Sequence, residues 1–109
     1  MLEAVFGSEG AERILLYLTA RGEGYAYGIA ETLDMPVSNV QRHLERMERG
    51  GLLVSSTIGR TRMYKFNPRF GFLPEVEALL EKALTRLPET IRLKLIVQRR
   101  RSRRAGKPL

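Results

Sequence analysis

Residues 37–49 constrain what this chain can fold into more than any other segment. On a helix that turns about 100° per residue, the apolar side chains of this segment share one face. That face consists of Val37, Val40, Leu44 and Met47, and the opposite face consists of Ser38, Asn39, Gln41, Arg42, Glu45, Arg46 and Arg49. Pro36 stands beside the first helical position, where its missing N–H costs least, and Gly50-Gly51 supplies a left-handed C-cap. The segment therefore predicts an amphipathic helix with one face in a core and the other in solvent.

The residues after this helix predict a β-hairpin with a basic tip. Strands over 52–58 and 62–66 flank the turn Gly59-Arg60-Thr61-Arg62. Asn67-Pro68 ends the hairpin, because proline lacks the N–H that a strand ladder needs. We expect Ile58, Tyr64 and Phe66 to pack inward.

Helical spacing predicts further helices on both sides of these elements. Ser8 can cap a helix over 9–21, whose apolar side is formed by Ala11, Ile14, Leu15 and Leu18. A short strand or extended link at 25–27 leads into a second helix over 28–33, and Asp34-Met35 makes the turn that follows. A helix over 74–87 carries six apolar positions, namely Val76, Leu79, Leu80, Ala83, Leu84 and Leu87. Pro88 ends this helix, and apolar residues from 91 to 97 suggest a further helical or extended segment.

These elements together predict a mainly α protein with a small β-hairpin, a winged helix-turn-helix with an additional C-terminal helix. The chain has 109 residues, of which 43% are hydrophobic, so it can fill one core but not two. We expect the domain to span residues 1–87, with terminal helices that dimerise, and residues 88–109 to form a basic C-terminal extension.

The net charge of +7 is concentrated in two parts of the chain. Residues 35–69 hold seven basic and two acidic side chains, and residues 88–109 hold eight basic and one acidic. Residues 1–34, in contrast, hold two basic and six acidic side chains. The first basic part coincides with the predicted amphipathic helix and hairpin. A phosphate backbone favours such segregation through counterion release, so the charge pattern indicates a nucleic-acid partner.

The sequence offers little to support catalysis. It has no cysteine, no glycine-rich phosphate loop, no acidic or histidine cluster at metal-ligand spacing, and no serine beside a plausible base. The single histidine, His43, is interpreted as a packing or hydrogen-bonding residue, with a DNA phosphate contact as the alternative. We therefore expect no enzyme activity, no cofactor and no metal. No signal peptide and no apolar run of about 18–20 residues is present, so we expect a cytoplasmic protein without a membrane partner.

The polar face of the segment 37–49 has the chemistry of base recognition. Its first turns present Ser38, Asn39, Gln41 and Arg42, in the part of a helix-turn-helix that enters the major groove. Arginine can bond guanine O6 and N7 together, and Asn or Gln can pair with adenine N6 and N7. Because Ser, Asn and Gln are mediocre helix formers, their presence here suggests a role other than helix stability. Arg46 extends this face, and Arg60, Thr61 and Arg62 are expected to contact phosphates or the minor groove. The alternative for both groups is an ordinary solvated surface.

Several segments carry a resemblance to a known family. VFGSEGAERILLYL, YGIAETLDMPVSNVQRHLERMERGGLL and GRTRMYKFNP, followed by FLPEVEALLEKAL, resemble the ArsR-type winged helix-turn-helix regulators, and more narrowly the subgroup associated with small nucleotidyltransferase domains. The resemblance spans about residues 5–87 and is most specific over 40–53 and at Gly59-Arg60. It implies that the third helix enters the major groove, that the wing follows the backbone, and that terminal helices form a homodimer. The cysteine and histidine sets with which this family senses metals are not reproduced, and Pro36 stands where a serine or threonine cap is usual.

The leading hypothesis is a sequence-specific, double-stranded DNA-binding transcriptional regulator, acting as a homodimeric repressor. The surplus of apolar positions in helix 74–87 supports the dimer, with helix 9–21 sharing its interface. A winged-helix adaptor for a separately encoded enzyme and an RNA-binding protein are the alternatives. The tail residues Arg99, Arg100, Arg101, Arg103, Arg104 and Lys107 are expected to follow a DNA backbone without recognising bases. The alternative is a tail that contacts nothing and only increases solubility.

Overall fold

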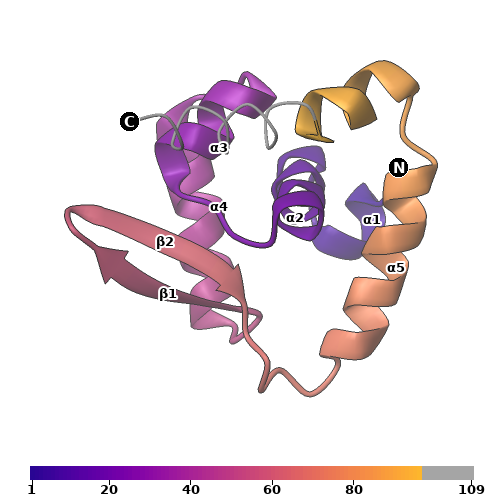
Figure 1. The fold of residues 1–109 in the computed structure, drawn as a ribbon. Helices are drawn as coiled ribbons and strands as arrows, with labels where there is room; N and C mark the ends of the chain where they lie inside the picture. Colours follow the sequence, from indigo (N-terminus) through magenta and orange to yellow (C-terminus); the bar gives the residue numbers. More distant parts are fainter. Residues whose placement is uncertain (97–109) are drawn as a thin grey trace, which may run out of the picture.

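The computed structural model describes residues 1–96 and shows a mainly helical fold with one antiparallel hairpin (Figure 1). Its elements are α1 (Glu3–Phe6), α2 (Glu9–Arg21), α3 (Ala26–Leu33), α4 (Val37–Arg49), β1 (Leu53–Ile58), β2 (Thr61–Phe66) and α5 (Leu73–Thr85). Residues 89–96 are also helical. Helices α3 and α4 form a helix-turn-helix, and β1 and β2 form the wing. The predicted fold class, a winged helix-turn-helix with an additional C-terminal helix, is confirmed.

Helix α2 is the centre of the core, and the other helices surround it in Figure 1. It begins where predicted, because the backbone N–H of Ala11 donates to the Ser8 hydroxyl at 3.0 Å and so satisfies one free donor of the first turn. Ile14, Leu15 and Leu18 are at most 1% exposed. Helices α3, α4 and α5 all contact α2, which fixes their relative placement.

The turn between α3 and α4 gives the helix-turn-helix its shape. Asp34 adopts the left-handed conformation at the end of α3, with φ 56° and ψ 51°. Pro36 follows with φ −61° and ψ 134°, and its carbonyl accepts the N–H groups of Asn39 and Val40. Proline therefore serves as the N-cap residue of α4 through its backbone, without a side-chain cap.

Helix α3 begins earlier than the sequence predicted. We expected residues 25–27 to be extended, but only Tyr25 is, and it is the N-cap of a helix that starts at Ala26. The strand-like contact lies one residue before, where Gly24 pairs with Tyr64 of β2 through hydrogen bonds of 2.8 and 3.0 Å. The aromatic residues at 25 and 27 favour strands by propensity, and the helix overrides that local preference.

Helix α4 has the predicted bounds, and its C-terminus shows how the chain turns into the wing. Gly50 remains right-handed, with φ −78°, and Gly51 is the left-handed residue, with φ 86°. The N–H of Leu52 donates to the carbonyl of Met47 at 3.0 Å, which is the pattern of a Schellman motif. The left-handed cap is therefore provided by the second glycine of the pair.

The wing has a shorter turn than predicted. Ile58 pairs with Thr61, so Gly59 and Arg60 alone form the loop, and Gly59 has the positive φ (65°) that the first position of a tight hairpin turn requires. The expectation that Ile58 packs inward is wrong, because it is 58% exposed. Side chains alternate along a strand, so Ile58 lies on the face opposite to Leu53, which is buried together with Tyr64.

Most apolar side chains of α5 are buried or half-buried within the single chain, although the sequence predicted a surplus for a partner copy. In α5, Leu80 and Ala83 are buried, Val76 and Leu84 are half-buried, and Leu79 is 38% exposed. Helix 89–96 is attached to the core by Leu95, which is 2% exposed and whose carbonyl accepts Arg21 Nε at 3.1 Å. Within residues 1–96 no helix has the length and apolar character needed to span a membrane.

Candidate nucleic-acid interface

Helix α4 holds a polar face in solvent because its other face is anchored in the core. Val40 and Leu44 are 0% exposed and Met47 is 8% exposed. The exposed side chains of the helix are Ser38, Gln41, Arg42, Glu45, Arg46 and Arg49. Asn39 is half-buried and lies at the edge of this surface. Four of the five helix residues that the sequence assigned to DNA contact thus share one solvent-facing surface.

His43 lies between this face and the core, where α4 meets the first turn of α2. A Cβ atom added at Gly10 would lie 3.1 Å from both His43 Nε2 and Met35 Cε, so glycine allows this close approach. A guanidinium N–H of Arg46 lies 3.3 Å from His43 Nδ1. Burial, and then the charges of Arg46 and Arg42, lower the pKa of His43 from its usual value. A neutral imidazole is therefore favoured, and its Nδ1 can accept the Arg46 hydrogen bond.

A polar network connects α4 to the wing. The Ser55 hydroxyl on β1 donates to Glu48 Oε2 at 2.6 Å, and Arg62 Nη1 on β2 donates to the same hydroxyl at 3.3 Å. Arg62 Nη1 is also 3.7 Å from Glu48 Oε1. The register explains this arrangement, because Ser55 and Arg62 lie on the same face of the hairpin as Leu53 and Tyr64.

The three residues expected at the wing tip are therefore separated. Arg60 occupies the two-residue loop and is exposed, Thr61 is half-buried at the start of β2, and Arg62 reaches back to Ser55 and Glu48. The sequence did not predict that Glu48 and Ser55 connect α4 to the wing, because these contacts depend on the strand register and on the angle between α4 and the hairpin.

Three cations of this region have no neighbouring acid among the described residues. Within the part of the chain that the structure describes, no carboxylate oxygen lies within ion-pair distance of Arg42, Arg49 or Arg60. Arg49 was not among the predicted contact residues, although it lies on the same exposed face as Arg42. Positive charges without local partners produce a field that reaches into solvent, which favours a polyanion.

A fourth exposed group lies in the first turn of α3. Tyr27 is 66% exposed there, in the helix that crosses the DNA backbone in helix-turn-helix complexes. A phenolic hydroxyl can donate to a phosphate oxygen. The sequence did not identify it, because residue 27 was assigned to an extended link.

The geometry defines a winged helix-turn-helix protein, and comparison with known proteins agrees. Residues 13–56, from α2 to β1, match the family model described as a helix-turn-helix domain. No curated protein sequence matched the chain.

Solved structures share the fold at low sequence identity. The apo form of a double mutant of Lactococcus lactis ZitR has a TM-score of 0.54 at 21% identity; the match covers 71% of this chain and 61% of the ZitR chain. Bacillus subtilis YusO has a TM-score of 0.55 at 18% identity, covering 91% of this chain and 76% of its own. The adhesin competence repressor AdcR of Streptococcus pyogenes has a TM-score of 0.53 at 13% identity, covering 97% and 87%. These likenesses establish the fold.

Proposed function

We propose that this protein is a sequence-specific, double-stranded DNA-binding transcriptional regulator that acts as a homodimeric repressor in the cytoplasm. The observation that carries the proposal is the exposed face of α4, where Gln41 and Arg42 stand next to cations that have no acidic partner among residues 1–96. A solvated helix surface would typically pair its charges along the helix, as Glu9 and Arg13 do on α2.

The dimensions and chemistry of α4 suit the major groove. A helix of 13 residues is about 20 Å long, and the major groove is about 12 Å wide, so the first turns can reach base edges. Ser38, Gln41 and Arg42 supply donors and acceptors for those edges, while Arg46, Arg49 and Arg60 are placed for phosphates. In this proposal Arg62 acts mainly by fixing the wing to α4, and Asn39 and Thr61 make peripheral contacts.

The homodimer is supported by apolar side chains that this chain leaves exposed near its C-terminal helices. Leu79, Ile91, Leu93 and Ile96 are each 38–45% exposed. A two-fold dimer places half-sites about 10–11 base pairs apart and requires an approximately palindromic site, whose occupation can block a promoter.

The assignment to the ArsR-type regulators, in the subgroup associated with nucleotidyltransferase domains, is part of this proposal. It is supported by the motifs over 40–53 and at Gly59-Arg60, which lie in α4, its cap and the wing turn. The basic tail, Arg99 to Lys107, lies outside the described residues. Its proposed role is to strengthen binding to the DNA backbone.

Selection of bound fragments from a random duplex library tests the function directly. The full chain should enrich a shared, approximately palindromic motif, and a structured RNA of equal charge should compete poorly with the selected duplex. Enrichment of no motif, together with equal competition by RNA, would favour an RNA-binding protein. Failure to bind either nucleic acid at low salt would favour the protein-interaction module.

A further inference from the structure

A cavity of about 300 Å³ lies between α2, the end of α3 and residues 86–95. Its volume is at the lower end of the range of small-molecule sites. The apolar part of its lining consists of Met1, Leu16, Leu33, Leu87, Pro88, Ile91 and Leu95. Among the described residues, those of α4 and the wing take no part in the lining, so this cavity is separate from the proposed DNA surface.

The polar and charged residues of the lining are Glu9, Glu12, Arg13, Thr32, Arg86 and Lys94, and among them Glu12 is the carboxylate that is buried. Glu12 lies in the first turn of α2 and is only 4% exposed. Its Oε2 atom is buried and has no hydrogen-bond partner among the residues that the structure describes. A buried oxygen without a partner is destabilising by about 1–3 kcal/mol, and more when it is charged. The position of Glu12 near the helix N-terminus stabilises its charge but does not supply the missing partner.

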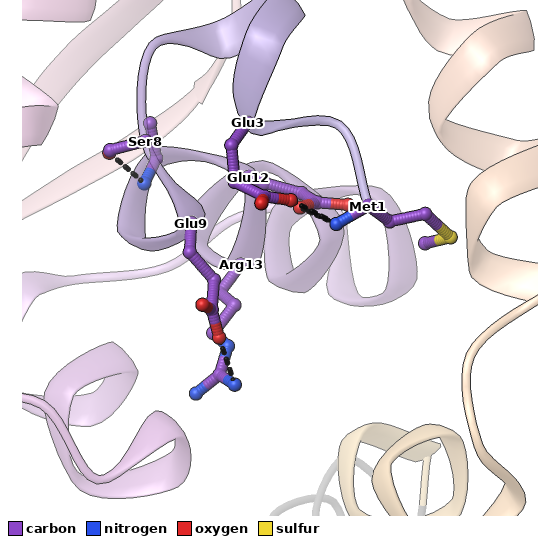
Figure 2. Close-up of polar contacts among 7 residues, drawn as sticks. Met1, Glu3, Ser8, Glu9, Glu12 and Arg13 are labelled. Carbon is purple, nitrogen blue, oxygen red and sulfur yellow. Dashed lines mark hydrogen bonds and ion pairs between the residues drawn. The ribbon is translucent and has the colours of Figure 1, made fainter.

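The structure also shows which group suits this carboxylate. The Met1 ammonium lies 3.3 Å from Glu12 Oε1 and is hydrogen-bonded to Glu3 as well (Figure 2). Hydrogen bonding to Glu3 raises the pKa of this ammonium above its usual value; desolvation opposes the shift, and hydrogen bonding to Glu12 adds a smaller increase. An ammonium group can therefore approach Glu12 through Oε1, while Oε2 is buried and has no hydrogen-bond partner among the described residues.

We propose that the cavity binds a small molecule with a primary ammonium group on an apolar body. The ammonium would donate to Glu12 Oε2, and the apolar body would lie against Leu16, Leu87 and Ile91. A metal ion does not fit, because no group of three or more potential ligand side chains exists within residues 1–96. A ligand that carries only negative charge would leave Glu12 Oε2 without a donor, although Arg13, Arg86 and Lys94 also line the cavity. The ligand could be a simple amine or an amino acid, whose carboxylate would find Arg86 or Lys94 in the lining.

The site contacts the helix-turn-helix at one point. Thr32 and Leu33, the last residues of α3, form part of the wall, and α4 begins four residues after Leu33. An occupant therefore touches the helix that supports α4. Binding of the ligand goes beyond the proposed DNA function and can be measured on the protein without DNA.

The test uses the full chain and three probes of similar length: n-hexylamine, 1-hexanol and norleucine. Backbone amide chemical shifts are followed by NMR as each probe is added. We expect saturable shifts around residues 12, 32 and 87 with n-hexylamine, and binding at least tenfold weaker with 1-hexanol, which cannot form the ion pair. Norleucine binding as tightly as n-hexylamine, or more tightly, would identify the amino acid as the better ligand class.

Two matched variants locate the site. Glu12→Gln should weaken n-hexylamine binding at least tenfold, whereas Glu9→Gln, the same change one turn away in the same lining, should leave it within twofold. If Glu12→Gln does not fold, Leu87→Trp fills the cavity and leaves Glu12 in place, and it should abolish the saturable shifts. Equal binding of 1-hexanol, equal binding by a folded Glu12→Gln variant, or the absence of saturable shifts at millimolar n-hexylamine overturns the proposal. Binding of the wild-type chain to its selected duplex is measured separately, so failure of the ligand site is distinguished from failure of the DNA function.

Discussion

Arg42 and Arg60 carry the same charge but stand in different places, which gives them separable roles. Arg42 lies in the exposed second turn of α4, and Arg60 lies in the wing loop. Replacing Arg42 with Ala should weaken binding to the selected duplex by about 1–3 kcal/mol and reduce discrimination between bases at one base pair. Replacing Arg60 with Ala should weaken all duplexes alike and lower the slope of log K against log salt by about one unit.

Binding titrations of both variants against the selected duplex and single-base variants of it, at several salt concentrations, measure these effects. Gln41→Ala is expected to behave like Arg42→Ala. Uniform loss over all duplexes after Arg42→Ala would show that α4 contacts only the backbone.

His43 links stability to pH through its lowered pKa. The unfolded chain protonates this imidazole near the usual value of 6.5, whereas the folded protein resists protonation until a lower pH. The neutral imidazole therefore contributes fully to the free energy of unfolding above about pH 6.5. This contribution is lost as the pH falls toward the pKa of His43 in the folded protein.

The free energy of unfolding of the wild type and of His43→Gln, measured by urea denaturation at several pH values, checks this. The variant should lose less stability than the wild type between about pH 7 and pH 5. Carboxylates titrate in both proteins and cancel in the difference. Parallel curves over this range would mean that His43 does not contribute to the pH dependence.

At the scale of elements, the network between Glu48 and Ser55 stabilises the attachment of the wing to α4. Replacing Ser55 with Ala removes the hydroxyl that bridges Glu48 and Arg62, and should lower the free energy of unfolding by about 1 kcal/mol. Ser56→Ala provides the control, since Ser56 is exposed on the other face of the hairpin. Urea denaturation measures the free energy of unfolding of both variants. If the two values are equal, the network does not contribute to stability.

The elements predicted best from sequence were those with several agreeing signals. The bounds of α4 followed from its amphipathic period together with Pro36 and the glycine pair, and α2 followed from Ser8 and its apolar spacing. The wing strands were found, but their two-residue loop was not, because the sequence Gly59-Arg60-Thr61-Arg62 permits more than one register. That shift of register explains both the exposure of Ile58 and the inward reach of Arg62.

Other features could not be predicted because they depend on distant packing. Helix α1 has only four residues, which is too short for a periodic pattern. Glu12 is polar in sequence, yet it is 4% exposed and lies beside the Met1 ammonium, in the lining of a cavity that residues 86–95 complete. The exposed face of α4 could be predicted from its amphipathic period. That Asn39 is half-buried could not be predicted, because it depends on where neighbouring elements lie.

For the whole molecule, the test of dimerisation must avoid residues that hold the single domain together. Leu80 is 0% exposed, so an acidic residue there would unfold the chain whether or not a dimer exists. Leu93→Asp and Ile96→Asp change exposed residues of helix 89–96 instead. We expect the wild type to sediment as a dimer at micromolar concentration and these variants to sediment as folded monomers.

Ile58→Asp, in the exposed part of the wing, is the control and should remain dimeric. The wild type and all variants sedimenting as monomers would exclude the homodimer. Dimers that persist in Leu93→Asp and Ile96→Asp would place the interface elsewhere.

The hydrogen bonds that join Ser55 to Glu48 and Arg62 have a consequence for the rate at which complexes dissociate. A wing that is already ordered loses little conformational entropy when it meets DNA, because the strands and side chains need not be fixed at that moment. Loosening the wing should therefore shorten the lifetime of the complex while leaving the diffusional encounter nearly unchanged. The duration of DNA occupancy would then be set partly by a hydroxyl group whose hydrogen bonds lie within the protein.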